Sequence, residues 1–169
     1  MGTPWWVAPP LLFGATVVQS SFFPALGLHA LRPDFVLQMV VIWALLRGWR
    51  EALPWGFVGG LFLDLFSGAP FGTAALALVL VAFCCSAGSV SAFRDNPLLP
   101  VVVVFWASVL YGLLYLFLLR THEVPVPWLS SLRQVVVPGA IVNTVLAPLT
   151  FWALSRIERR TRSTVAVDW

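Results

Sequence analysis

One uncharged stretch decides the fold class: residues 98–119 read LLPVVVVFWASVLYGLLYLFLL. A helix that crosses the hydrocarbon core of a membrane needs about 20 predominantly apolar residues. This stretch supplies them without a single charged side chain, so it is the clearest membrane span that the sequence predicts.

The composition of the whole chain agrees with that stretch. Of its 169 residues, 60% are hydrophobic and 10% are charged, and the mean hydropathy is +0.91. Ordinary soluble domains are about 45–50% apolar and about 25% charged, and a small soluble domain leaves much of its surface exposed to water. These values exclude a water-soluble enzyme and a soluble nucleic-acid-binding domain. They also exclude intrinsic disorder, which requires low hydrophobicity.

Further apolar runs lie on both sides of residues 98–119, and together they predict an all-α integral membrane protein with a bundle of six transmembrane helices. The expected spans are residues 5–23, 34–47, 52–66, 70–93, 98–119 and 134–154, in a single membrane domain over residues 1–169 with a basic tail at 155–169. No arginine precedes Arg32, so the first run is interpreted as a retained span rather than a signal peptide. Pro125 and Pro127 predict a non-helical linker between Arg120 and Arg133.

The second and third runs are short. A helix from Asp34 to Arg47 rises about 20 Å, whereas the hydrocarbon core is about 30 Å thick. Either this helix begins before the Arg32-Pro33-Asp34 turn, or its ends lie in a thinned or protein-lined region. A re-entrant hairpin formed by the two short runs is the alternative to two full spans.

Arginine placement predicts the orientation. With six spans, seven arginines fall on the side of the two termini and three on the other side. The seven are Arg47, Arg50, Arg94, Arg156, Arg159, Arg160 and Arg162, and the three are Arg32, Arg120 and Arg133. Basic residues accumulate on the cytoplasmic side, so both termini are expected in the cytoplasm.

Asp64 is the only acidic residue inside an apolar run. One hypothesis is structural: its carboxylate accepts backbone N–H bonds from the turn that enters the next helix, or pairs with Arg32. The other hypothesis is a proton or cation site, which would need a chain of ionisable groups. The structural hypothesis is favoured because no second buried ionisable group is apparent.

Small residues at helical spacing suggest close helix packing. Asn143 has Gly139 and Ala147 four residues to either side, and Gly56 and Gly60 form a GxxxG motif. Such faces suit close backbone approach and interhelical amide bonds. They fit packing within the chain, which is favoured, and they fit a partner's helix equally well.

The sequence predicts no enzyme, cofactor or metal site. It lacks a nucleophile–histidine–acid set, paired carboxylates, a phosphate-binding loop and an HExxH motif. The adjacent Cys84 and Cys85 are interpreted as small packing residues, and His29 and His122 lack ligand-spaced neighbours. The scattered arginines do not form the clustered basic face of a nucleic-acid reader.

Three stretches carry a family resemblance: LRPDFVL at residues 31–37, WALLRGWRE at 43–51 and GFVGGLFLDLFSGAPFG at 56–72. They resemble the MreD family of rod shape-determining proteins. The matching positions of this chain are Gln19, Arg32, Pro33, Asp34, Arg47, Gly48, Asp64, Ser67, Gly68, Pro70 and Gly72.

The resemblance implies a non-catalytic, multi-pass protein of the bacterial cytoplasmic (inner) membrane that serves the cell-elongation complex. The implied partners are MreC, most directly, and MreB, RodA and its transpeptidase as further members of a complex that directs lateral peptidoglycan synthesis and cell shape. MreC's transmembrane helix is expected in a small-residue groove near Gly56, Gly60, Gly139 and Asn143, with Arg32, Asp34 and Asp64 organising the outer surface.

The family's fold is also similar to the S components of energy-coupling-factor transporters. A substrate-binding S component of a vitamin transporter is therefore the alternative function.

Overall fold

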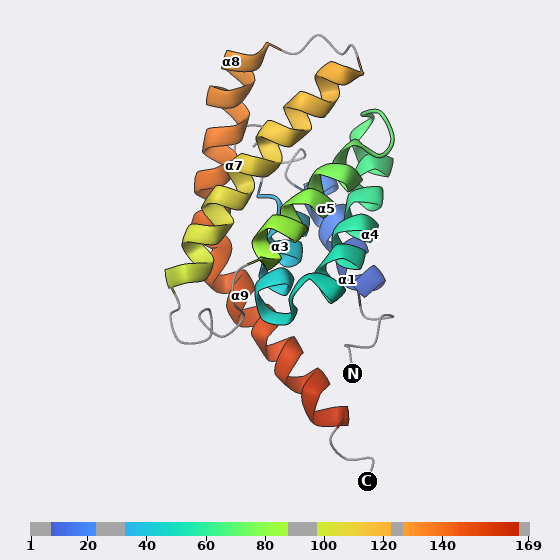
Figure 1. Ribbon diagram of the computed structural model, residues 1–169, viewed down its shortest axis with the longest axis vertical. Coiled ribbons are helices and arrows are strands. Elements are labelled where there is room, and N and C mark those ends of the chain that lie inside the picture. Colours follow the sequence, from blue (N-terminus) through green and yellow to red (C-terminus); the bar gives the residue numbers. More distant parts are fainter. Residues whose placement is uncertain (1–7, 23–32, 88–97, 123–126, 166–169) are drawn as a thin grey trace.

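The protein is a bundle of helices (Figure 1). Its computed structural model describes residues 8–22, 33–87, 98–122 and 127–165. In chain order the helices are α1 (Ala8–Val17) with the π-helical turn η2 (Val18–Phe22), α3 (Phe35–Arg47), α4 (Trp49–Ser67), α5 (Thr73–Ser86), α7 (Leu98–Thr121), and α8 (Trp128–Ser131) continuing through the π-helical η3 (Leu132–Val136) into α9 (Val137–Val165). No strand occurs among the described residues, and the all-α class is confirmed.

Both ends of α3 are set by local chemistry. The Asp34 side chain accepts a hydrogen bond from the backbone N–H of Leu37 at 3.0 Å, which is an N-cap. At the other end, Gly48 has a φ of +79°, a conformation that glycine adopts without strain. The chain therefore turns at Gly48 and enters α4 one residue later.

Helix α3 is the central helix of the bundle. It contacts α1, α4, α5, α7 and α9, and every residue from Val36 to Leu45 except Met39 is buried. A helix surrounded by protein does not need to match the bilayer thickness by itself. The helix begins at Phe35, so the explanation that it starts before the Pro33-Asp34 turn is wrong. The burial of α3 supports the other explanation, in which the short helix lies in a protein-lined region.

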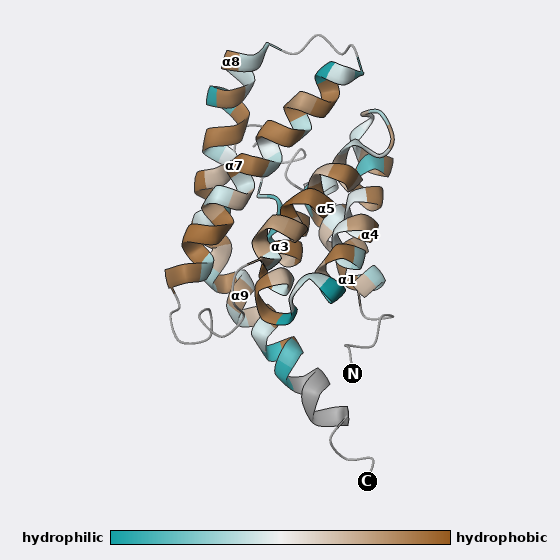
Figure 2. Ribbon diagram, in the orientation of Figure 1, coloured by the Kyte–Doolittle hydropathy of each residue, from teal (hydrophilic) through white to brown (hydrophobic). Residues whose placement is uncertain are grey.

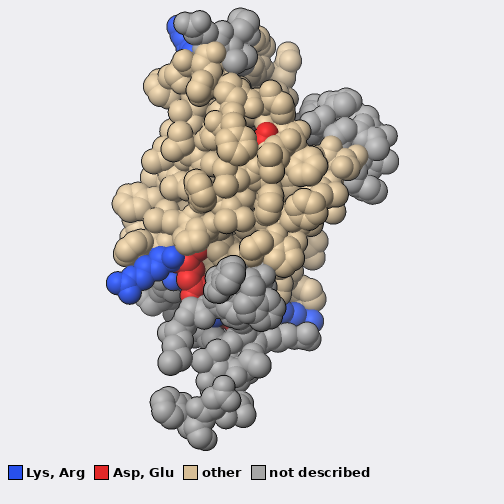
Figure 3. Space-filling view, turned by 90° about the vertical axis from the view of Figure 1, so that its right-hand side faces the viewer, with Lys and Arg blue, Asp and Glu red and all other residues tan. Residues whose placement is uncertain are grey.

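The outer helices carry an exposed apolar surface. Figure 2 shows hydrophobic residues over most of the bundle and hydrophilic ones on the lower part of α9 and at the α3–α4 corner. Figure 3 shows the visible arginines near the two ends, with a broad surface between them that is uncharged except for one acidic side chain in its upper part. Large apolar residues that are more than half exposed include Phe57, Leu65, Leu76, Phe83, Trp106, Phe117, Val145, Leu149 and Trp152. An apolar surface this extensive is typical of contact with lipid or with other proteins.

Two helical segments are long and apolar enough to cross a membrane, namely Leu98–Thr121 and Trp128–Arg159. Helices α3 and α5 are apolar but shorter. The count of six transmembrane spans stays a prediction, although six helical segments occupy the described part of the chain.

The structure changes several boundaries. Helix α4 begins at Trp49, ahead of the expected run at 52–66, and continues through Pro54. The prediction of a non-helical linker up to Arg133 is wrong from Trp128 onward, because the last helix starts directly after Pro127. A proline just before or at a helix start lacks only an N–H that would have no helical partner there. The expected tail at 155–169 is helical as far as Val165.

Candidate functional site

Three of the buried polar side chains, Gln38, Ser108 and Asn143, form a hydrogen-bonded group near the start of α3. Asn143, on α9, is at their centre. Its amide oxygen accepts hydrogen bonds from the backbone N–H of Asp34 at 2.8 Å and from Gln38 Nε2 at 3.1 Å. Its Nδ2 donates to Ser108 Oγ of α7 at 3.0 Å. One amide thus joins three helices.

Thr150 and Gln19 complete this arrangement. Gln38 is fully buried, and its Oε1 accepts a hydrogen bond from Thr150 of α9 at 2.8 Å. Gln19, in η2, accepts from the backbone N–H of Val36 at 3.2 Å and donates to Asp34 Oδ1 at 3.4 Å. We refer to the set as the central polar network: Gln19, Asp34, Gln38, Ser108, Asn143 and Thr150.

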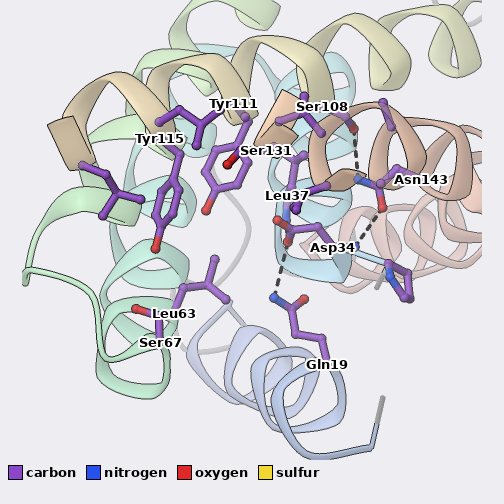
Figure 4. A pocket seen from close by; sticks show the side chains of 18 of the residues that line it. Gln19, Asp34, Leu37, Leu63, Ser67, Ser108, Tyr111, Tyr115, Ser131 and Asn143 are labelled. Carbon is purple, nitrogen blue, oxygen red and sulfur yellow. Dashed lines mark hydrogen bonds between the residues drawn. The ribbon is translucent and has the colours of Figure 1, made fainter. Parts of the chain in front are cut away.

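A cavity of about 480 Å³ lies beside this network. It is bounded by η2, the start of α3, the end of α4, the second half of α7, and the segment from Ser131 to Asn143. Figure 4 shows Tyr111 and Tyr115 projecting into it from α7, with Asp34 and Gln19 beside them. Its volume is in the range of small-molecule pockets.

Two apolar residues that line the cavity also face outward: Phe66 at the end of α4 and Val135 in η3, which are 48% and 61% exposed. We infer that the cavity opens between these two side chains. An occupant entering there would bring apolar surface with it.

Asp64 lies at the end of α4, where it holds the start of α5. The carboxylate is 4% exposed and accepts three backbone N–H bonds, from Gly72 at 2.9 Å, Ala74 at 2.8 Å and Ala75 at 3.2 Å. This geometry is that of the backbone-capping hypothesis. The alternative partner Arg32 lies outside the described residues.

The rest of the third family stretch forms the turn around Asp64. Ser67 Oγ accepts from the Ala69 N–H at 3.2 Å, and Gly68 ends α4 in the left-handed region with a φ of +67°. The Pro70 carbonyl accepts a hydrogen bond from the Thr73 hydroxyl at 2.6 Å. These motif residues build the corner between α4 and α5, together with Gly72.

The small-residue faces mostly point inward. A Cβ at Gly60 would lie 2.2 Å from Ala75 Cα, and one at Gly56 would lie 3.2 Å from the Leu78 carbonyl oxygen. The GxxxG motif is therefore filled by α5. Of the residues expected to form a groove on the last span, Ala147 and Asn143 are buried, and only Gly139 has open space beside it.

The second family stretch forms a charged cluster at the opposite end of the bundle. Arg47 Nε lies 3.4 Å from Glu158 Oε1 on α9, and Arg47 Nη1 lies 3.6 Å from Glu51 Oε1. Glu51 also accepts from Trp43 Nε1 at 3.2 Å, and Trp43 stacks on Trp55 with ring centroids 4.3 Å apart. We call this set the Arg47 cluster: Trp43, Arg47, Glu51, Trp55 and Glu158.

Sequence reasoning missed several of these residues. Gln38, Ser108 and Thr150 were available as isolated polar residues in apolar runs, which is the signal that singled out Asn143 and Asp64. Glu158 stands among arginines and gave no sign of burial, yet it is 5% exposed. The cysteine pair is only partly as expected: Cys85 packs against the core, whereas Cys84 is exposed.

The described polar groups are mainly engaged in holding helices together. Among the described residues, no group of three or more His, Cys, Asp and Glu side chains could hold a metal ion. His29 lies outside the described residues.

A family model described as rod shape-determining protein MreD matches residues 3–156. The chain belongs to the MreD family. The match covers all three motif stretches, the central polar network and most of α9. MreD proteins are membrane proteins of the cell-shape machinery, so the match gives the chain a role in rod shape determination and, in general, partners in the rod complex. MreD components are generally non-enzymatic. No solved structure matches the chain, and the similarity to S components stays a prediction.

Proposed function

We propose that the chain is a non-catalytic membrane scaffold of the rod complex, which binds the transmembrane helix of MreC and thereby helps direct lateral peptidoglycan synthesis with MreB, RodA and its transpeptidase. The observation that carries the proposal is the MreD match over residues 3–156. This match favours shape determination over the vitamin-transporter alternative.

The cavity between α4 and η3 is the docking position that the geometry supports best. Gly56 and Gly60 pack against α5, so they are withdrawn from the groove expected for MreC. Gly139 remains, because it lines the cavity and a Cβ there would meet nothing within 4 Å. Helices associate in lipid through close packing and a few polar contacts. A partner helix lying across Phe66 and Val135 would bring its side chains into the cavity.

The orientation proposed is six spans in the bacterial inner membrane with both termini in the cytoplasm. The Arg47–Glu158 pair supports it, since it places the α3–α4 corner at the same end as the lower part of α9. Of the described arginines, Arg47, Arg50, Arg156 and Arg159 lie toward that end, and Arg120 and Arg133 lie toward the other (Figure 1). A reporter enzyme fused after Trp49 should therefore be active in the cytoplasm, and extracytoplasmic activity would contradict the orientation.

The test of the scaffold role is co-purification with MreC. Gly139→Leu fills the cavity and should reduce the recovered MreC at least about ten-fold, given what steric exclusion from a packed contact costs. Gly14→Leu is the matched control, because Gly14 is an exposed helical glycine on α1 with nothing within 4 Å. In a rod-shaped host that depends on this chain, Gly139→Leu should also give rounded cells. Equal MreC recovery from both variants would remove the cavity from the proposal, and recovery of no MreC with the wild-type chain would reject MreC binding.

A further inference from the structure

The charge inside the cavity is unusual for this chain. All ten basic residues are arginines and the net charge is +3, yet no described arginine lines the cavity. Asp34 is the one charged side chain among the described residues around it. The described lining of the cavity thus carries one negative side chain and no positive one.

Only one of the two Asp34 carboxylate oxygens is engaged by the described residues. Oδ1 accepts hydrogen bonds from the Leu37 N–H at 3.0 Å and from Gln19 Nε2 at 3.4 Å. Oδ2 accepts none from any described residue. A carboxylate oxygen is stabilised by a donor or a positive charge placed beside it. The cavity is where such a group could reach it.

Two tyrosines add a second feature that favours a cation. The rings of Tyr111 and Tyr115 have centroids 5.8 Å apart, and both project into the cavity, as Figure 4 shows. The face of an aromatic ring attracts an ammonium or guanidinium group placed within about 6 Å of its centroid. A carboxylate next to two tyrosine rings, in a lining that mixes apolar side chains with serines and two amides, is chemistry suited to an organic cation.

We propose that the cavity binds a guanidinium or ammonium group carried by the partner's chain, with Asp34 Oδ2 as its anion and Tyr111 and Tyr115 as its aromatic walls. This inference rests on the proposed scaffold function and specifies what the partner presents. The apolar mouth at Phe66 and Val135 fits a basic side chain on a helix that packs in the membrane. A zwitterionic lipid headgroup fits less well, because its phosphate would find no described arginine around the cavity.

The first arm of the test uses small probes on the purified full-length chain in non-ionic detergent. Octylguanidinium should raise the melting temperature of the wild type in a saturable way, whereas octanol should not. Asp34→Asn should weaken octylguanidinium binding by about ten-fold or more, as expected for a lost charge-assisted hydrogen bond. Asparagine is also a good N-cap, so the start of α3 is preserved. Glu51→Gln is the control, because it removes an acid at the opposite end of the bundle.

Two results of this arm would overturn the proposal. One is equal binding of octylguanidinium by the wild type and by Asp34→Asn. The other is a rise in affinity in Arg32→Gln, because the chain's own Arg32 would then be the group that neutralises Asp34.

The second arm identifies the source of the cation by co-purification with MreC. Asp34→Asn should lower the recovered MreC about ten-fold. Replacing the arginines and lysines in and beside MreC's transmembrane helix by glutamine, one at a time, should identify one with the same effect. The two changes together should lower the recovery of MreC no more than either change alone. If Asp34→Asn abolishes probe binding but leaves MreC recovery unchanged, the cation comes from elsewhere, such as a lipid amine, and the proposal is overturned.

The arms also separate this inference from the scaffold role. If the wild type binds MreC but shows no preference for octylguanidinium over octanol, the cation chemistry is wrong and the scaffold role stands. If the wild type recovers no MreC, the scaffold role fails, and the partner's cation fails with it.

Discussion

The amide oxygen of Asn143 lies 2.8 Å from the backbone nitrogen of Asp34, and 109 residues separate the two in the chain. The bond ties the last helix to the first turn of the central one. It also satisfies an N–H that no helical carbonyl can reach, because the first N–H groups of a helix lack partners within it. Asp34 of the RPD motif is thus held in place by a residue far along the sequence.

Asn143→Ala should destabilise the bundle by about 2–4 kcal/mol, since it leaves two buried donors without their acceptor and each such group costs roughly 1–3 kcal/mol. The donors are the Asp34 N–H and Gln38 Nε2. The free energy of unfolding in mixed detergent micelles gives the measurement. Thr144→Ala is the neighbouring control, because Thr144 bonds only to the Ala140 carbonyl of its own helix. Equal effects of the two variants would contradict the central role of Asn143.

Asp64→Leu should cost more than about 3 kcal/mol, because three backbone N–H groups at the start of α5 lose a charged acceptor. Asp64→Asn retains one acceptor oxygen and should cost less. Ser67→Ala, at an exposed position, should change stability by no more than about 0.5 kcal/mol. If Asp64→Leu is as stable as the wild type but loses function, the carboxylate serves a ligand or proton instead.

Gly60→Ala should destabilise the α4–α5 contact by about 1–3 kcal/mol or more, which is typical of overpacking. The new Cβ would lie 2.2 Å from Ala75 Cα, and backbone atoms cannot move aside as a flexible side chain can. Gly14→Ala should instead stabilise the protein by about 0.5–1 kcal/mol, because alanine favours helix and the site is open. Thermal unfolding of both variants tests the pair, and a stabilising Gly60→Ala would be inconsistent with the packing.

Arg47→Met should cost about 3 kcal/mol or more, since it removes the cation from a largely buried pair. A double-mutant cycle with Glu158→Met should give a coupling energy of about 1–3 kcal/mol. Arg50→Met is the control, because Arg50 is exposed and should change stability by no more than about 0.5 kcal/mol. A coupling energy of zero would show that the contact between the two helices adds nothing.

The sequence predicts the helical class and the approximate positions of the helices, because both depend on neighbours along the chain. Capping by Asp64 is visible in the sequence because the backbone N–H groups that donate to its carboxylate lie only 8–11 residues ahead. The glycine spacing at Gly56 and Gly60 likewise indicates a close helix contact. The space beside these two glycines is filled by α5, which is the next helix in the chain.

What the sequence does not reveal depends on which face of each helix is buried. In α5 and α7 apolar residues occur on all sides, so periodicity does not distinguish the lipid side from the protein side. The pairings of Gln38 with Thr150 and of Arg47 with Glu158 join residues more than 100 positions apart. The cavity with Tyr111 and Tyr115 arises from the same long-range packing.

The enclosure of α3 has a consequence for biogenesis. Gln38 and the Asp34 N–H obtain their partners from α9, the last helix to be synthesised. In the proposed six-span topology, α3 enters the membrane before these groups have their final acceptors. We therefore expect the amino-terminal helices to remain loosely associated, or sheltered by the insertion machinery, until α9 has been made. The central helix α3 is thus made early, but its polar groups obtain their partners only after α9 has been made.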